Sequence, residues 1–310
     1  MLIFMLVIFL GATSWILAQS NATEVRQQLD HTTASAMGRA KEALIGRAAS
    51  NANLPGSLTC PDVNNDGVAD GNFGICVALV GRLPWKTLDV PELRDGNGER
   101  LWYALAAKLR DNPVSRPINP LQALPLSIDG AANIAAIIFS AGPPMANQNG
   151  RPSNAITDYL DGSNNDGDNA YVSGLSSTTF DDKTLVITRE ELFRTVNQRV
   201  LGEIRGPDNN APAAPSYGLR RYHSVNGSFP WADSGADGFG DVGTTAGKLP
   251  YSELELQALP PPPPGSPYDW LYSNAWLPLV AYERVNANQA VITIGTSKMT
   301  VIPCPGSPCP

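Results

Sequence analysis

Oxygen-bearing side chains alternate along Cys60–Gly71, whose sequence is CPDVNNDGVADG. Three of them occupy every second position, a glycine that permits a tight turn follows, and a further aspartate comes four residues after the last of the three. This pattern matches the opening of the D-x-[DN]-x-[DN]-G calcium loop, in which alternate oxygens face the ion and a backbone carbonyl adds another ligand. The predicted calcium ligands are Asp62, Asn64, Asp66, the carbonyl of Val68, and Asp70.

The motif departs from the EF-hand at its twelfth position, which is Phe73 in place of the bidentate glutamate. Other oxygens or water would have to complete the coordination of the ion. The alternative interpretation is an Asn-Asp-Gly turn stabilised by side-chain caps, with no ion. Two weaker acidic loops, Asp161–Asn169 and Asp233–Asp241, also offer oxygen ligands, and we interpret both as solvated turns.

The chain has four cysteines, Cys60, Cys76, Cys304 and Cys309. An even number behind an apolar N-terminal segment indicates an oxidising compartment and two disulfides. We predict local pairing, Cys60 with Cys76 and Cys304 with Cys309, because each pair is close in sequence. A disulfide that brackets the acidic motif would lower the entropic cost of ordering it. A metal site is the weaker alternative, since neither pair has C-x-x-C spacing.

Motifs of common enzyme classes are absent from the sequence. There is no G-x-S-x-G nucleophile elbow, no H-E-x-x-H helix and no dinucleotide-binding glycine pattern. The net charge of −7, with 22 basic residues, argues against a nucleic-acid-binding surface. We therefore predict neither catalysis nor nucleic-acid binding.

The N-terminal segment Met1–Ala18 is apolar except for Thr13 and Ser14, and is close to the minimum length of a membrane-spanning helix. The helical pattern continues to Asn53, where Asn-Leu-Pro-Gly ends it. Apolar residues recur on one stripe of this continuation: Val25, Leu29, Ala36, Ala40, Ala43 and Leu44. The sequence predicts one helix of roughly 80 Å, hydrophobic on all sides at first and amphipathic afterwards.

This N-terminus, the stretch AKEALIGRAA at Ala40–Ala49 and a cysteine-containing remainder resemble type IV pilins and type II secretion pseudopilins. The resemblance implies processing by a prepilin peptidase, anchoring in the bacterial inner membrane, and self-association into a cell-surface filament with the help of the pilus assembly machinery. Major subunits of that family carry glutamate at the fifth mature position, where this chain has Met5, a departure that tip-type minor subunits share. The apolar residues implied in assembly are Met1, Met5, Phe9 and Trp15.

The resemblance thus predicts a structural filament subunit. The alternatives are a minor tip subunit or adhesin with a ligand-binding head, a membrane-anchored periplasmic enzyme, and a periplasmic protein on a plain signal anchor. The aromatic segment Tyr268–Tyr282 would serve an adhesin as a carbohydrate platform, and core packing explains it equally well.

The expected fold class is α+β, with the long helix (1–53) packed on a mixed, mainly antiparallel sheet in a head domain (54–310) with extended loops. We expect strands at Phe73–Val80, Ala132–Ser140, Thr184–Ile187 and Ala290–Ile302. Helices are expected at Gly98–Arg110 and, after a capping box that starts at Thr188, as far as Ile204. No internal repeat is evident.

Overall fold

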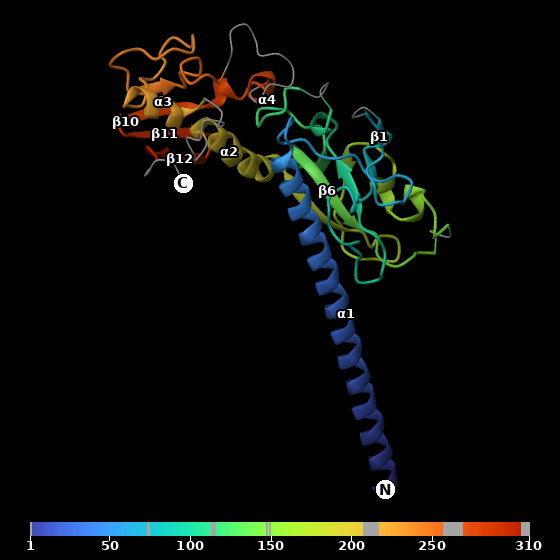
Figure 1. Ribbon diagram of the computed structural model, residues 1–310. Helices are drawn as coiled ribbons and strands as arrows, with labels where there is room; N and C mark the ends of the chain where they lie inside the picture. The colour runs from blue at the N-terminus through green and yellow to red at the C-terminus, as the bar shows by residue number, and fades with distance from the viewer. Residues whose placement is uncertain are drawn as a thin grey trace.

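The computed structural model describes residues 2–72, 75–112, 116–146, 148, 150–206, 217–256 and 269–304, and their side chains from residue 23 onward except those of residues 72 and 269. As predicted, the fold is α+β, with a long N-terminal helix and mainly antiparallel sheets. The helix extends away from the head with the N-terminus at its far end (Figure 1).

Helix α1 (Leu2–Ser50) contains 49 residues and is therefore about 74 Å long. Only its C-terminal part packs on the head, while residues 23–28 are exposed. Asn51 ends the helix by accepting hydrogen bonds from the backbone N–H groups of Asn53 and Leu54 at 3.0 and 2.9 Å. The side chains of α1 that are buried against the head are Thr33, Ala36, Met37, Ala40, Leu44 and Ala48.

In the part of the chain that the structure describes, no helix has an apolar stretch long enough to cross a membrane. The side chains of residues 2–22 lie outside that part. The apolar span predicted for Met1–Ala18 stays a prediction.

The first sheet is a four-stranded antiparallel sheet whose strands are neighbours in chain order. It consists of β3 (Val80–Arg82), β4 (Trp102–Leu105), β6 (Ile134–Ser140) and β8 (Lys183–Thr188). Helix α1 packs against β6 and β8. All seven residues of β6 are buried, which explains why its first six residues, Ile134–Phe139, are all apolar. The strands predicted at 132–140 and 184–187 are confirmed.

The helix predicted at Gly98–Arg110 is wrong. That segment contains β4 and a short 3-10 helix, η1 (Ala107–Leu109). Strand β4 lies between β3 and β6, and all four of its residues are buried. Pairing on both edges outweighs the helical spacing of the leucines, and Trp102 and Tyr103 are types that strands favour.

The second sheet has the same architecture and begins after helix α2 (Arg189–Arg205). Thr188 caps α2 as predicted, because its hydroxyl accepts a hydrogen bond from the N–H of Glu191 at 3.1 Å. The strand predicted at Ala290–Ile302 is instead a hairpin that turns at Gly295, where φ is +56°. The strands are β9 (Ala246–Lys248), β10 (Ala281–Asn286), β11 (Gln289–Ile294) and β12 (Ser297–Val301).

Short elements fill the connections between these strands. The strand predicted at Phe73–Val80 is wrong as a single element, since β2 ends at Cys76 and β3 starts at Val80; residues 73–74 lie outside the described part. The paired short strands are β1 (Gly71–Asn72) with β2 (Ile75–Cys76), and β5 (Ser127–Ile128) with β7 (Ala170–Tyr171). The short helices are η3 (Ile156–Asp158), η4 (Gly162–Asn165), α3 (Leu219–Asn226), α4 (Asp269–Ser273) and η5 (Leu277–Leu279).

The two sheets are structural repeats of each other. In the first, Tyr103 lies opposite Gly81 on one side and Ile138 on the other. In the second, Tyr282 lies opposite Gly247 and Ile292. The helix before each sheet packs on its third and fourth strands, α1 on β6 and β8, and α2 on β11 and β12. The expectation that the chain has no internal repeat is therefore wrong. We call residues 33–188 repeat 1 and residues 189–301 repeat 2.

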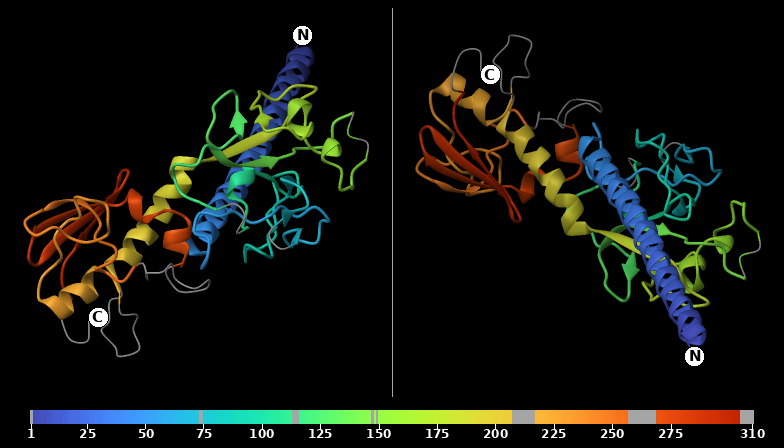
Figure 2. Two further views of the ribbon diagram at one scale, coloured as in Figure 1. Left: turned by 90° about the horizontal axis from the view of Figure 1, so that it is seen from above. Right: turned by 90° about the horizontal axis from the view of Figure 1, so that it is seen from below.

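The buried positions of the two helices follow the same spacing. Ala36, Ala40, Leu44 and Ala48 face the head in α1, and Leu192, Val196, Val200 and Ile204 are buried in α2. The larger side chains of α2 fit its position, because α2 also contacts α1, β6 and β8 and so lies between the repeats (Figure 2).

The interface between the repeats is buried and continuous with the core. Phe193 of α2 is almost completely buried and lies against repeat 1, because a Cβ on Gly56 would come within 2.8 Å of its ring. Arg199 donates to the carbonyl of Ala49 at 2.6 Å, so α2 is fastened to the C-terminal end of α1. The two repeats therefore form one folded body.

The repeats differ most between their third and fourth strands. Repeat 2 joins β11 to β12 by the hairpin at Gly295, whereas repeat 1 joins β6 to β8 by residues 141–182. We call residues 141–182 the insertion.

Candidate functional site

The five predicted calcium ligands lie in one tight turn, which we call the Asp62 loop (residues 62–70). Asp62 is fully buried, and its two carboxylate oxygens accept hydrogen bonds from the N–H groups of Asn65 at 2.6 Å and Gly67 at 2.7 Å. Asp66 accepts from the N–H of Val68 at 2.7 Å.

The far end of the loop is held in the same way. One oxygen of Asp70 accepts from the N–H groups of Val63 at 2.6 Å and Asn64 at 3.0 Å, and the other accepts from the Asn64 side chain at 3.0 Å. These contacts form the capped turn that the sequence left open as an alternative. Calcium binding by this loop remains a prediction.

Two opposing effects act on the carboxyl group of Asp62. Burial raises the pKa of Asp62 above its ordinary value, while the hydrogen bonds from Gly67, Asn65 and Asp66 oppose that rise. Gly67 is required by geometry, because its φ is +87° and a Cβ would lie 2.5 Å from the indole nitrogen of Trp85. Asn65 also adopts a left-handed conformation, with φ at +71°.

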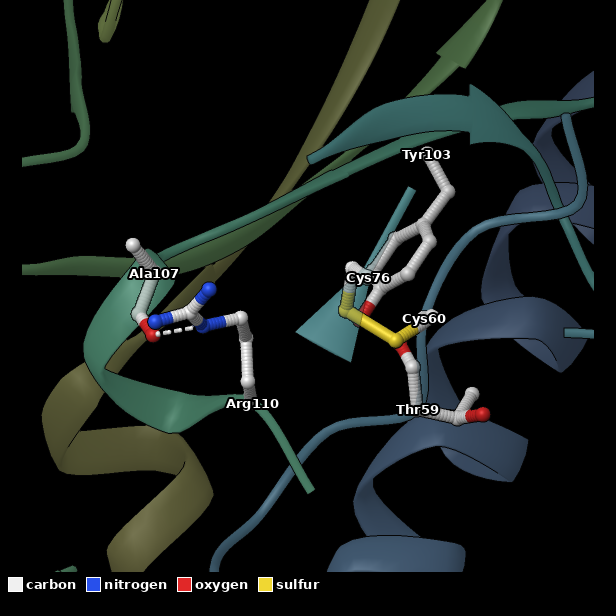
Figure 3. Close-up of a disulfide and its surroundings, with 6 residues drawn as sticks. All are labelled: Thr59, Cys60, Cys76, Tyr103, Ala107 and Arg110. Carbon is white, nitrogen blue, oxygen red and sulfur yellow. Dashed lines mark hydrogen bonds between the residues drawn. A yellow bond between two sulfur atoms is a disulfide. The ribbon is translucent and has the colours of Figure 1, made fainter. Parts of the chain in front are cut away.

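A disulfide joins the segments on either side of the loop, and a buried tyrosine connects the segment before the loop to the first sheet (Figure 3). Cys60 and Cys76 are joined at an S–S distance of 2.06 Å, the pairing predicted from their proximity in sequence. Tyr103 of β4 donates to the carbonyl of Thr59 at 3.2 Å. The second predicted pair includes Cys309, which lies outside the described residues; Cys304 is disulfide-bonded.

Repeat 2 contains the same turn at Asp233–Asp241, which we call the Asp233 loop. Asp233 is fully buried and accepts from the N–H groups of Ala236 at 2.5 Å and Gly238 at 2.7 Å. Tyr282 donates to the carbonyl of Pro230 at 2.9 Å, as Tyr103 does to Thr59. Because both repeats build this turn, we interpret it as part of the fold shared by the repeats.

The covalent clamp is not repeated. Trp231 occupies the position that Cys60 has in repeat 1, directly after the carbonyl that receives the tyrosine hydroxyl. The guanidinium of Arg284 lies 3.9 Å from the centroid of the Trp231 ring. A cation–π contact thus stands at the place of the disulfide.

A third acidic group lies in the insertion, where Asp161, Asp181 and Asp182 place carboxylate oxygens within 4.8 Å of one another. Asp161 and Asp182 are 1% and 3% exposed. Burial raises the pKa of Asp182 to about 7; burial, followed by the charge of Asp161, raises the pKa of Asp181 to about 6.

Sequence reasoning treated 161–169 as a solvated turn and missed Asp181 and Asp182. Only η4 and the start of β8 bring these residues together, since twenty positions separate Asp161 from Asp181 along the chain. The two adjacent aspartates before an apolar strand were the one local signal available.

The predicted assembly residues Met5, Phe9 and Trp15 belong to the part of α1 that extends beyond the head (Figure 1). Their side chains, and Met1 altogether, lie outside the described part of the chain.

The aromatic segment is mainly core. Trp270, Trp276 and Tyr282 are at most 5% exposed, whereas Tyr272 is 44% exposed. This burial favours core packing over a carbohydrate platform.

Comparisons with protein-family models, with curated proteins and with solved structures found no match for this chain.

Proposed function

We propose that the chain is a structural subunit of a type IV pilus-like or pseudopilus filament, assembled through the N-terminal half of α1. The supporting observation is that one continuous helix extends beyond the head, whose buried contacts with α1 begin at Thr33. By sequence, Met1–Ala18 has only two polar side chains. Such a helix needs an apolar environment that its own head does not supply.

A bilayer and a filament core both provide that environment. Burial of a side chain of the size of Leu or Phe contributes about 1.5–3 kcal/mol, so exposure of the whole segment to water would be strongly unfavourable. Transfer of the helix from the inner membrane to a bundle of the same helices from other copies keeps it dry throughout. The proposal includes processing by a prepilin peptidase and a cell-surface location of the filament.

The two-repeat head favours a second candidate, a minor subunit at the filament end. Repeat 2 adds a second sheet near the end of α1 that is far from the N-terminus (Figure 1). Helix α2 begins directly after β8, so repeat 2 has no apolar extension of its own. A subunit with a head of two repeats and a single assembly helix suits the end of a filament, where it has few neighbouring subunits.

The experiment is a substitution in the free half of α1. We expect Trp15→Lys to abolish recovery of the protein in sheared filaments, because a charge in the bundle would be buried without a partner. Val242→Lys, at an exposed site in repeat 2 (89% exposed), is the control and leaves assembly intact. Unchanged incorporation of the Trp15 variant, or absence of the unmodified protein from filaments, would contradict the proposal. Quantification of copies per filament separates the major from the terminal subunit.

A further inference from the structure

The acidic cluster of Asp161, Asp181 and Asp182 holds oxygen atoms that nothing in the described protein satisfies. One oxygen of Asp182 accepts hydrogen bonds from the N–H of Asp161 and the side chain of Asn164, both at 2.9 Å. Its other oxygen, Oδ1, is buried and has no hydrogen-bond partner. Oδ1 of Asp181 is in the same situation. Buried acceptors without partners are uncommon, and each one costs free energy.

No basic side chain of the described residues forms an ion pair with these three carboxylates. The guanidinium of the nearby Arg151 instead donates hydrogen bonds to the backbone carbonyl oxygens of Asp158 at 2.6 Å and of Gly142 at 2.8 Å. Its one acidic contact is Glu99, at 3.6 Å. A further acid, Asp95, is close enough to raise the pKa of Asp181. The charge of Arg151 lowers the pKa of Asp181 and so offsets part of this negative charge, but the pKa of Asp181 is still raised overall.

The remaining oxygens are positioned by well-formed hydrogen bonds. Asp161 accepts from the Gln148 side chain at 2.8 Å with one oxygen and from the N–H of Asp181 at 2.9 Å with the other. Two of the three carboxylates are fixed and dry, and the third, Asp181, retains partial exposure. Asp181 is therefore the member of the cluster that lies nearest to solvent.

We propose that Asp161, Asp181 and Asp182 bind a hard divalent cation, with Ca²⁺ the best-matched ion. Ca²⁺ takes oxygen ligands at about 2.3–2.6 Å, so two ligands of one ion lie up to about 5 Å apart, which the cluster satisfies. Carboxylates and water complete such a shell without nitrogen or sulfur. The ion would join the middle of the insertion to the residues that lead into β8, closing the insertion on itself.

The test uses the full chain in detergent, treated with chelator and then titrated with CaCl₂ by calorimetry and by thermal unfolding. We expect a binding event that raises the melting temperature, and at least tenfold weaker binding in Asp182→Asn and in Asp181→Asn. One variant serves as the control and retains binding, and a second reports separately on the Asp62 loop. Asp168→Asn removes an exposed carboxylate of the insertion, and Asp66→Asn alters the Asp62 loop.

Each outcome decides the proposal. If neither Ca²⁺ nor Mg²⁺ produces binding heat or a shift in melting temperature, the proposal is wrong. The three carboxyl groups would then be stabilised by protons shared among them. Binding lost in Asp66→Asn and kept in Asp182→Asn would overturn it by placing the ion in the Asp62 loop. The Asp181 variant distinguishes lost binding from misfolding, because Asp181 is partly exposed and its substitution disturbs the core less than that of Asp182. These measurements do not depend on filament assembly, so they test the cation site independently of the proposed function.

Discussion

Tyr103 and Tyr282 occupy equivalent places in the two sheets. Each lies opposite a glycine of the preceding strand and donates its hydroxyl proton to a backbone carbonyl just before a buried aspartate. Burial raises the pKa of both hydroxyls, which keeps them protonated and able to donate. The same long-range hydrogen bond occurs in both repeats, which indicates that the two repeats have the same fold.

Removal of either hydroxyl should weaken the fold to a similar degree. We expect Tyr103→Phe and Tyr282→Phe each to lower the free energy of unfolding by about 1–3 kcal/mol, because a buried carbonyl loses its donor. Denaturant unfolding measures this, with Tyr272→Phe as the half-exposed control. A loss confined to one of the two buried tyrosines would refute their equivalence.

Gly67 should tolerate alanine less well than a glycine of similar backbone in open space. Both glycines have a positive φ, +87° at Gly67 and +79° at Gly167. A new Cβ at Gly67 would clash with Trp85, whereas a new Cβ at Gly167 would have no neighbour within 4 Å. We expect Gly67→Ala to destabilise by more than about 1 kcal/mol and to exceed Gly167→Ala. Thermal unfolding compares the stabilities of the two variants. Equal losses of stability would show that backbone strain at positive φ accounts for the whole effect and that the clash with Trp85 adds nothing.

The repeats should unfold together when their interface is damaged. Phe193→Ala removes a buried ring of α2 that lies against Gly56 of repeat 1, at an expected cost of about 3–5 kcal/mol. Hydrogen exchange should then show faster opening of β6 and of β11 alike. Loss of protection in repeat 2 alone would mean that the repeats are independent folding units.

Acid should weaken the contact between Glu92 and Arg100. A hydrogen bond from Arg100, followed by the charges of Arg100 and Arg94, lowers the pKa of Glu92 in the folded state despite slight burial. A lowered pKa contributes stability above the unfolded value, and this contribution disappears as the pH falls through the folded value.

Arg100 also donates to the carbonyl of Asn65 at 2.8 Å, so the loss reaches the Asp62 loop. Glu92→Gln should therefore reduce stability at pH 7 and flatten its decline below about pH 4.5. Unfolding curves across pH 3–7 test this, and identical pH dependence in both proteins would argue against the contact.

Local sequence signals identified some elements and not others. Helix α2 carries its own cap at Thr188, and β6 is apolar from Ile134 to Phe139, so both could be predicted. Strand β4 could not, because its identity depends on pairing with β3 and β6, which are distant in sequence. The Asp161 cluster is likewise a product of tertiary structure.

The duplication did leave a trace in the sequence. DVNNDGVAD at 62–70 and DSGADGFGD at 233–241 agree at both ends and at the central Asp-Gly, and GRLPWKTLDV at 81–90 corresponds to GKLPYSELEL at 247–256. Unequal connections between these segments hide the match from a search at fixed period. Comparison of short motifs without a fixed spacing would have found it.

Trp231 at the position of Cys60 gives the protein two forms of one turn, one covalently linked and one not. A reducing agent can open the linkage in repeat 1 and has no corresponding bond to open at the Asp233 loop. The same chain therefore contains a redox-sensitive loop and, as its internal reference, a redox-insensitive copy. Because a reducing agent also opens the disulfide of Cys304, a Cys60→Ser, Cys76→Ser variant is the cleaner comparison: a difference in mobility between its two loops would report the contribution of the Cys60–Cys76 disulfide alone.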